Sequence, residues 1–189
     1  MSLRERLIAI FCKAATSSRK IRNFLTFMGA VFFFTIIVIF IAVSLQVDEF
    51  LELPKLLPAP LNVIVSIPIL AIGMFLMLWS ILHFIKVKGT PAPFNPPSKL
   101  VTTGPYAYIR NPMLTGVFLL LYGFGALFRS ISLVFIFTPL FILLNVLELK
   151  AIEELELEKR FGKEYIEYKK RVPMFIPRLK LRTKRRFIN

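Results

Sequence analysis

Residues 24–47 read FLTFMGAVFFFTIIVIFIAVSLQV and contain no charged side chain. A helix needs about 20 consecutive apolar residues to cross a bilayer, so this stretch is long enough to span a membrane. The rest of the chain has the same character, since 56% of its 189 residues are hydrophobic and its mean hydropathy is +0.68. Soluble domains of this length are less apolar, so the composition predicts an integral membrane protein.

Three further apolar stretches follow, at residues 61–85, 113–128 and 131–147. Pro68 lies inside the first of them and predicts a kink. The last two are short for separate spans, so a single long buried stretch broken at Arg129 is the alternative to a helical hairpin. We favour the hairpin, because the two stretches together exceed one crossing and a charged residue separates them. The predicted fold is all-α, a single domain over residues 1–189 with four transmembrane helices, the last two a hairpin.

The charges predict how these helices are oriented. The formal net charge is +14, and the basic side chains concentrate in residues 1–23, 86–112 and 148–189. With four spans, all three segments lie on one side, and the positive-inside rule places that side in the cytoplasm with both termini. The first segment is predicted to be an interfacial amphipathic helix, and the last is predicted to form cytoplasmic helices. The expected location is the plasma membrane of a prokaryote or the endoplasmic reticulum of a eukaryote.

Several classes of function are disfavoured by composition. The chain has one cysteine, Cys12, and one histidine, His83, so it can form neither an internal disulfide nor a Cys/His metal cluster. A basic chain can bind nucleic acid, but here the long apolar runs between the basic segments indicate membrane topology and attraction to anionic lipid. We therefore expect membrane lipid as a partner, and neither a metal ion nor nucleic acid.

The connector at residues 86–112 is unusually rich in proline for a loop between spans. It holds six prolines, at positions 91, 93, 96, 97, 105 and 112. Proline fixes φ, so the segment is expected to be stiff without being helical. Pro112 suits the first turn of the next helix, with Asn111 as its N-cap and Arg110 beside a helix end that favours anions. A functional site and an ordinary cap with a snorkelling arginine are both consistent with this pattern.

The C-terminal region is charged but keeps a helical pattern. Glu153 and Glu154 follow the last predicted span by one to two turns, where they form either a solvated helical face or a carboxylate site facing the connector. Gly162 is a plausible end for this helix, and a second short helix is predicted at about residues 164–171, before Pro173.

Four motifs then occur in a fixed order: LVTTGPY at 100–106, RNPMLTG at 110–116, the Glu153-Glu154 pair, and FGKEYIEYKKRVP at 161–173. Together they make the chain resemble the isoprenylcysteine carboxyl methyltransferase family, part of a wider group that includes phospholipid N-methyltransferases, over about residues 70–178. The resemblance implies a membrane enzyme that uses S-adenosylmethionine. It also implies a cytoplasm-facing cofactor pocket, closed by the connector and the C-terminal helices, which the lipid substrate reaches from the bilayer.

The same resemblance assigns roles to individual residues. Arg110 corresponds to the arginine of the family's Arg-His-Pro-x-Tyr motif, in which Asn111 and Leu114 replace the histidine and the tyrosine. Leu149 stands where the family has a substrate-binding arginine, and the neighbouring Lys150 is the candidate substitute, so Arg110 and Lys150 are the catalytic candidates. The implied cofactor-binding residues are Ser98, Lys99, Leu100, Val101, Tyr106, Asn111, Pro112, Met113, Leu114 and Glu153.

The function predicted from these residues is methyl transfer from S-adenosylmethionine to a lipid-like acceptor in the membrane. An isoprenylcysteine-type carboxylate is the first acceptor that the resemblance implies. The alternatives are methylation of a phospholipid amine, or a non-catalytic membrane protein that retains the fold.

Overall fold

The computed structural model describes residues 18–86 and 99–177, and within these residues it contains helices and loops but no strand. The predicted all-α class is therefore confirmed. The first long helix, α2 (Arg19–Phe50), begins five residues before the predicted span. Most of the predicted interfacial segment 1–23, most of the connector, and residues 178–189 lie outside the described residues.

The second long helix, α3 (Leu61–Lys86), coincides with the predicted span at 61–85 and includes Pro68. After the connector, a short 3-10 helix, η1 (Gly104–Ala107), precedes α4 (Pro112–Leu127). Helices α3 and α4 approach each other closely at Gly73 and Gly116. A Cβ atom placed on Gly116 would lie 2.7 Å from the carbonyl oxygen of Gly73, so neither helix could carry a side chain at this crossing.

The fourth long helix continues well beyond the predicted span at 131–147. It passes without a break through η2 (Leu133–Phe137), α5 (Thr138–Glu148), η3 (Leu149–Glu153) and α6 (Glu154–Phe161). Two of these pieces, η2 and η3, are five-residue π-helical turns. The helix ends at Gly162, which adopts a φ of 54°, and α7 (Lys163–Arg171) follows. The predicted stop at Gly162 and the predicted second helix are both confirmed.

A tight turn at Arg129 joins α4 to this last helix, as the hairpin prediction requires. Arg129 has a φ of 61°, and the next residue, Ser130, donates its backbone N–H to the carbonyl of Gly125 at 2.9 Å. The guanidinium Nε of Arg129 donates to the carbonyl of Leu57 at 2.6 Å, which ties the turn to the loop between α2 and α3. The alternative of one long buried stretch is therefore wrong.

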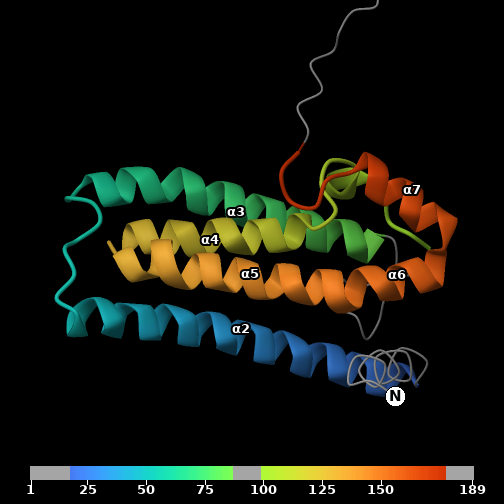
Figure 1. The fold of residues 1–189 in the computed structure, drawn as a ribbon, viewed down its shortest axis with the longest axis horizontal. Coiled ribbons are helices and arrows are strands. Elements are labelled where there is room, and N and C mark those ends of the chain that lie inside the picture. Colours follow the sequence, from blue (N-terminus) through green and yellow to red (C-terminus); the bar gives the residue numbers. More distant parts are fainter. Residues whose placement is uncertain (1–17, 87–98, 178–189) are drawn as a thin grey trace, which may run out of the picture.

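The four long helices run along one axis, with their connections at two opposite ends (Figure 1). The turn at Arg129 and the loop after α2 share one end, while η1, α6 and α7 share the other. Three helical stretches, Lys20–Phe50, Leu61–Lys86 and Leu133–Phe161, are long and apolar enough to cross a membrane, and α4 is a shorter apolar helix of 16 residues. The crossing of four helices and the cytoplasmic placement of the termini stay predictions.

Phenylalanines fill the contact between α2 and the last helix. The ring centroid of Phe40 lies 5.8 Å from that of Phe137 and 5.6 Å from that of Phe141, and Phe33 lies 5.8 Å from Phe141. The residues of the buried core cluster are Val117, Phe118, Leu121, Leu133 and Phe141. The core therefore lies between α4 and the last helix, and α2 covers it from one side.

Candidate functional site

The connector contacts residues 173–174 of the C-terminal region at the N-terminal end of α4. The backbone N–H of Arg110 donates to the carbonyl of Pro173 at 2.8 Å, and that of Asn111 donates to Met174 at 3.1 Å. The next residue, Phe175, packs on the core, with its ring centroid 5.2 Å from that of Phe118. Segments more than 60 positions apart in the sequence are thus hydrogen-bonded to each other at the N-terminal end of α4, as the predicted topology allowed.

A second attachment lies one turn away, between α7 and η1. The phenol of Tyr168 donates to the backbone carbonyl of Tyr106 at 2.7 Å, and both side chains are buried. The Tyr106 ring in turn packs edge-on against Phe84 of α3, at 5.0 Å between centroids. Burial raises the pKa of both phenols, so they remain neutral donors at physiological pH.

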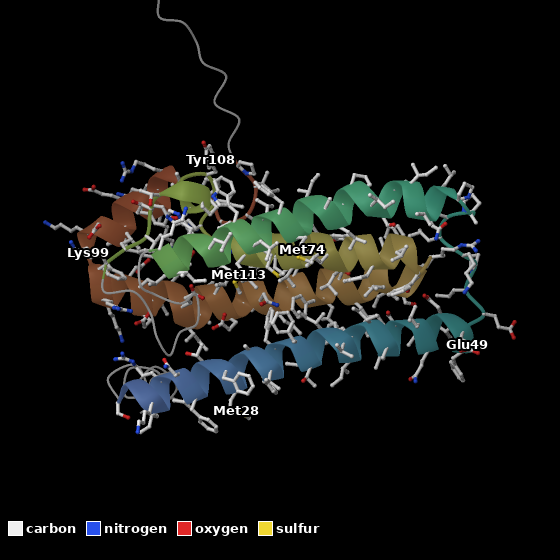
Figure 2. The ribbon with its side chains drawn as sticks, turned by 180° about the vertical axis from the view of Figure 1, so that it is seen from behind. Met28, Glu49, Met74, Lys99, Tyr108 and Met113 are labelled. Atoms are coloured by element: carbon white, nitrogen blue, oxygen red, sulfur yellow. The ribbon has the colours of Figure 1, made fainter. Side chains whose placement is uncertain are left out.

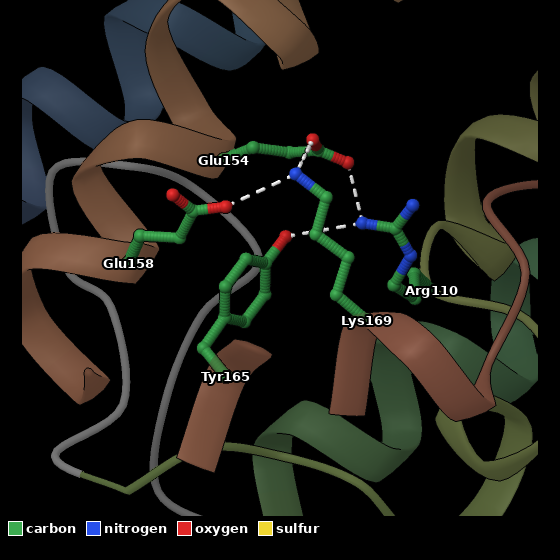
Figure 3. A network of polar contacts seen from close by, with 5 residues as sticks. All are labelled: Arg110, Glu154, Glu158, Tyr165 and Lys169. Atoms are coloured by element: carbon green, nitrogen blue, oxygen red, sulfur yellow. Dashed lines mark hydrogen bonds and ion pairs between the residues drawn. The ribbon is translucent and has the colours of Figure 1, made fainter. Parts of the chain in front are cut away.

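Arg110 is the centre of a third attachment, made by side chains (Figure 3). Its Nη1 donates to the carboxylate of Glu154 in α6 and to the phenol of Tyr165 in α7, the latter at 3.3 Å. The other oxygen of Glu154 pairs with Lys169 at 2.5 Å, and Lys169 also contacts Glu158 at 3.0 Å. Burial opposes the charge of the guanidinium, yet its contacts with Glu154 and Tyr165 leave the pKa of Arg110 raised.

These contacts explain the FGKEYIEYKKRVP motif in physical terms. Gly162 turns the chain into α7, Tyr165 and Tyr168 stand three residues apart on one helical face, and Pro173 presents its carbonyl to the connector. Burial raises the pKa of Tyr165 to about 12, so it too stays protonated. The sequence prediction missed these two tyrosines as site residues, although their spacing of three residues on a short amphipathic helix indicates that they share one face.

The two glutamates predicted to face the connector have different environments. Glu154 has both carboxylate oxygens occupied, by Arg110 and by Lys169. Glu153 is half-buried and makes no hydrogen bond or ion pair with any residue that the structure describes. Burial raises the pKa of Glu153 to about 8, and the neighbouring acids Glu148, Glu156 and Glu154 add to this rise while Arg110 opposes it.

Two polar groups at the junction between the connector, α6 and α7 therefore lack hydrogen-bond partners among the described residues. One is the carboxyl group of Glu153, whose pKa burial raises to about 8, and the other is the Nε of Arg110, which is buried and has no hydrogen-bond acceptor. Buried polar atoms without partners cost free energy unless a ligand satisfies them. The π-helical turn η3 ends at Glu153, and such turns within α-helices occur often at functional sites.

The remaining predicted residues are distributed along the connector and the first turn of α4. Lys99 is exposed, Leu100 and Val101 are half-buried, and Ser98 lies outside the described residues. Asn111 directly precedes α4, where its carbonyl accepts the N–H and the hydroxyl of Thr115, but its side chain makes no capping hydrogen bond. Pro112 is buried in the first turn, and Met113 and Leu114 are half-buried beside it.

Leu149 and Lys150, the two positions that the resemblance links to substrate binding, lie on the last helix and differ in exposure. Leu149 is 2% exposed and packed inside the molecule, whereas Lys150 is exposed. Tyr106 and Arg110 are close enough to Glu153 to interact with it electrostatically, whereas Lys150 makes no hydrogen bond or ion pair with any residue that the structure describes. Among the described residues no group of three His, Cys, Asp or Glu side chains is placed to hold a metal ion.

Comparison with known proteins gives two matches and one negative result. Residues 61–164 match the family model of phospholipid methyltransferases. Over 104 residues the chain is 35% identical to the nickel-cobalt-cadmium resistance protein NccN of Alcaligenes xylosoxydans xylosoxydans, a match that covers 55% of this chain and 44% of that protein. The match therefore spans less than half the length of that relative. No solved protein structure is detectably similar to the chain.

The segment matched by the family model contains α3, the connector, α4 and the helix that carries both glutamates. The chain belongs to the phospholipid methyltransferase family, within the isoprenylcysteine carboxyl methyltransferase-like group of membrane methyltransferases.

Proposed function

We propose that the chain transfers a methyl group from S-adenosylmethionine to a lipid-like acceptor held in the membrane. The observation that carries the proposal is that two groups near one another have no hydrogen-bond partner among the described residues: the carboxyl group of Glu153, whose pKa burial raises to about 8, and the buried Nε of Arg110. Arg110 lies where the connector meets the C-terminal segment, at the N-terminal end of the apolar helix α4.

The chemistry of these groups fits the proposed cofactor. S-adenosylmethionine carries a sulfonium and an ammonium group, which a carboxylate such as Glu153 would hold, and a carboxylate, which the free edge of Arg110 would hold. Glu154 would act indirectly, because its two oxygens are already occupied and keep Arg110 in place. Tyr106 and residues 111–114 would form the connector side of the pocket.

When bound, this cofactor supplies an electrophilic methyl group for in-line displacement. The chain's own part is to align the acceptor with that methyl group and to exclude water. The hydrogen bonds from α7 to the connector suit this task, because they fix the position of the connector at Tyr106 and at Arg110. An ionised carboxylate or a neutral amine is already nucleophilic, so the proposed reaction needs no catalytic triad.

The resemblance implies the carboxylate of an isoprenylated cysteine as the first acceptor. The amine of a phospholipid is the second candidate, and the surroundings of residue 149 favour it. Leu149 is apolar and buried, so it offers no cation to hold an acceptor carboxylate, and the neighbouring Lys150 is exposed and makes no ion pair with any described residue. Incubation of the protein with labelled cofactor and either acceptor distinguishes these two reactions, and labelling of neither would support a non-catalytic role.

Calorimetric titration with S-adenosylhomocysteine in detergent tests the donor pocket. We expect saturable binding that Glu153→Gln weakens about tenfold or more, since a hydrogen bond to a charged group contributes about 1.5–3 kcal/mol. Glu164→Gln is the matched control, because Glu164 is an exposed glutamate of α7 that makes no hydrogen bond or ion pair with any described residue. Equal affinities for the two variants would remove Glu153 from the pocket, and no saturable binding by the wild type would contradict the proposed function.

A further inference from the structure

The described end of the connector, at η1 and Tyr108, lies against α3 before the chain reaches Arg110. Tyr108, which directly follows η1, has its ring centroid 6.5 Å from that of Trp79, and Trp79 lies 5.5 Å from Phe75. Tyr108 is 63% exposed and Phe75 is 60% exposed, so this aromatic cluster faces away from the helical core. Figure 2 shows Tyr108 at the outer edge of the molecule, at the same end as Lys99 and opposite Glu49.

The position of Trp79 along α3 sets the depth of this cluster. Trp79 precedes the last residue of α3, Lys86, by seven positions, which at 1.5 Å per residue corresponds to about 10 Å. Between them the outward side chains of Leu82 and Ile85 are apolar and mostly exposed. The ring of Tyr108 therefore lies level with an exposed, apolar part of α3, about two helical turns from its end.

The rings of tryptophan and tyrosine have an apolar body and a polar edge, and they concentrate in the headgroup region of membranes. Two exposed lysines, Lys86 at the end of α3 and Lys99 at the same end of the molecule as Tyr108, can extend toward lipid phosphates. We propose that the Trp79–Tyr108 pair binds the phospholipid headgroup layer and holds the described end of the connector, residues 99–112, inside that layer and not above it in the water.

This seating has a consequence for the junction. Arg110 follows Tyr108 by two residues and is fastened to α6 through Glu154. The Arg110–Glu154 junction therefore lies at headgroup depth, where a group attached to a lipid can reach it without leaving the bilayer. The seating itself does not depend on methyl transfer, so it can be tested separately from the proposed function.

Trp79 is the single tryptophan of the chain, so intrinsic fluorescence reports on this site alone. The protein would be reconstituted in phosphatidylcholine vesicles brominated either near the carboxyl end of the acyl chains or near their middle. We expect stronger quenching by the bromines near the headgroup than by those at mid-chain, and weak quenching by aqueous acrylamide. Stronger quenching at mid-chain, or dominant quenching by acrylamide, would overturn the proposal.

The double variant Trp79→Phe/Tyr108→Trp moves the reporter onto the connector itself. Both substitutions keep an aromatic ring at each position, so the contact between connector and α3 is retained. We expect the same profile as for the wild type, with the headgroup-proximal bromines as the strongest quenchers. If the connector instead lies above the membrane, acrylamide will quench this variant strongly and the brominated lipids will not. Calorimetry with S-adenosylhomocysteine on the same sample shows separately whether donor binding stands or fails.

Discussion

Removal of the Glu154 carboxylate is expected to loosen the junction between the connector and the C-terminal helices. In the substitution Glu154→Gln the side chain keeps its size but loses its charge, so the guanidinium of Arg110 remains buried without a counterion. The side chains of Arg110 and Glu154 are only 10% and 9% exposed, so solvent screens this loss poorly.

The size of the effect follows from these exposures. Removing one partner of a buried ion pair costs about 3–5 kcal/mol, because the remaining charge stays desolvated. The second contact of Glu154, with Lys169, adds little, since the Lys169 side chain is 36% exposed and such pairs contribute about 0–1 kcal/mol. For a chain of this size, a loss of 3–5 kcal/mol corresponds to a fall in melting temperature of roughly 6–20 °C.

The assay is thermal unfolding in detergent, combined with hydrogen exchange of the connector. The amides of Arg110 and Asn111 bond to the carbonyls of Pro173 and Met174, so their protection from exchange reports directly on the junction. We expect both the melting temperature and the protection of these two amides to fall in Glu154→Gln.

The matched control is Glu156→Gln on the same helix. Glu156 contacts Arg160 at 3.8 Å, and their side chains are 25% and 29% exposed, so the pair should contribute no more than about 0.5 kcal/mol. The reasoning would be refuted if Glu154→Gln melted no lower than Glu156→Gln, or if the two connector amides kept their protection.

Two further predictions concern the packing around the site. Tyr168→Phe removes the donor to the Tyr106 carbonyl and should lower the free energy of unfolding by about 1–3 kcal/mol, so an unchanged denaturation midpoint would contradict this bond. Gly116→Ala places a Cβ 2.7 Å from the Gly73 carbonyl oxygen and should destabilise by about 1–3 kcal/mol, measured as a lower melting temperature. An unaffected melting temperature would mean that α3 and α4 do not cross there.

The parts of the fold that sequence predicts well are those set by local composition. The spans at 24–47 and 61–85 are uncharged runs of sufficient length, and α2 and α3 contain them. Arg129 marked the hairpin correctly, because a charged residue is costly within an apolar helix and suits a turn. By contrast, the helix through residue 161 passes from apolar to charged sequence without a break, and nothing local to residue 148 reveals that continuity.

The contact between the connector and the C-terminal region was predictable from the sequence, but the individual residue contacts were not. Adjacent residues on a helix point about 100° apart, so which glutamate of the pair meets Arg110 depends on the rotation of the helix. The π-helical turn η3 changes that rotation just before Glu154, and the sequence pattern does not predict this turn. Arg110 therefore pairs with Glu154, while Glu153 retains the unpaired carboxylate that the resemblance had implied for the cofactor.

The proposed function is the transfer of a methyl group by this chain onto a lipid held in the membrane. The most direct test incubates the purified protein in vesicles of membrane lipid extract with methyl-labelled S-adenosylmethionine, followed by mass spectrometry of the lipid fraction. We predict label in a lipid whose mass rises by one methyl group, with much less label for Glu153→Gln than for Glu164→Gln. Binding of the cofactor without label in any lipid would contradict the claim.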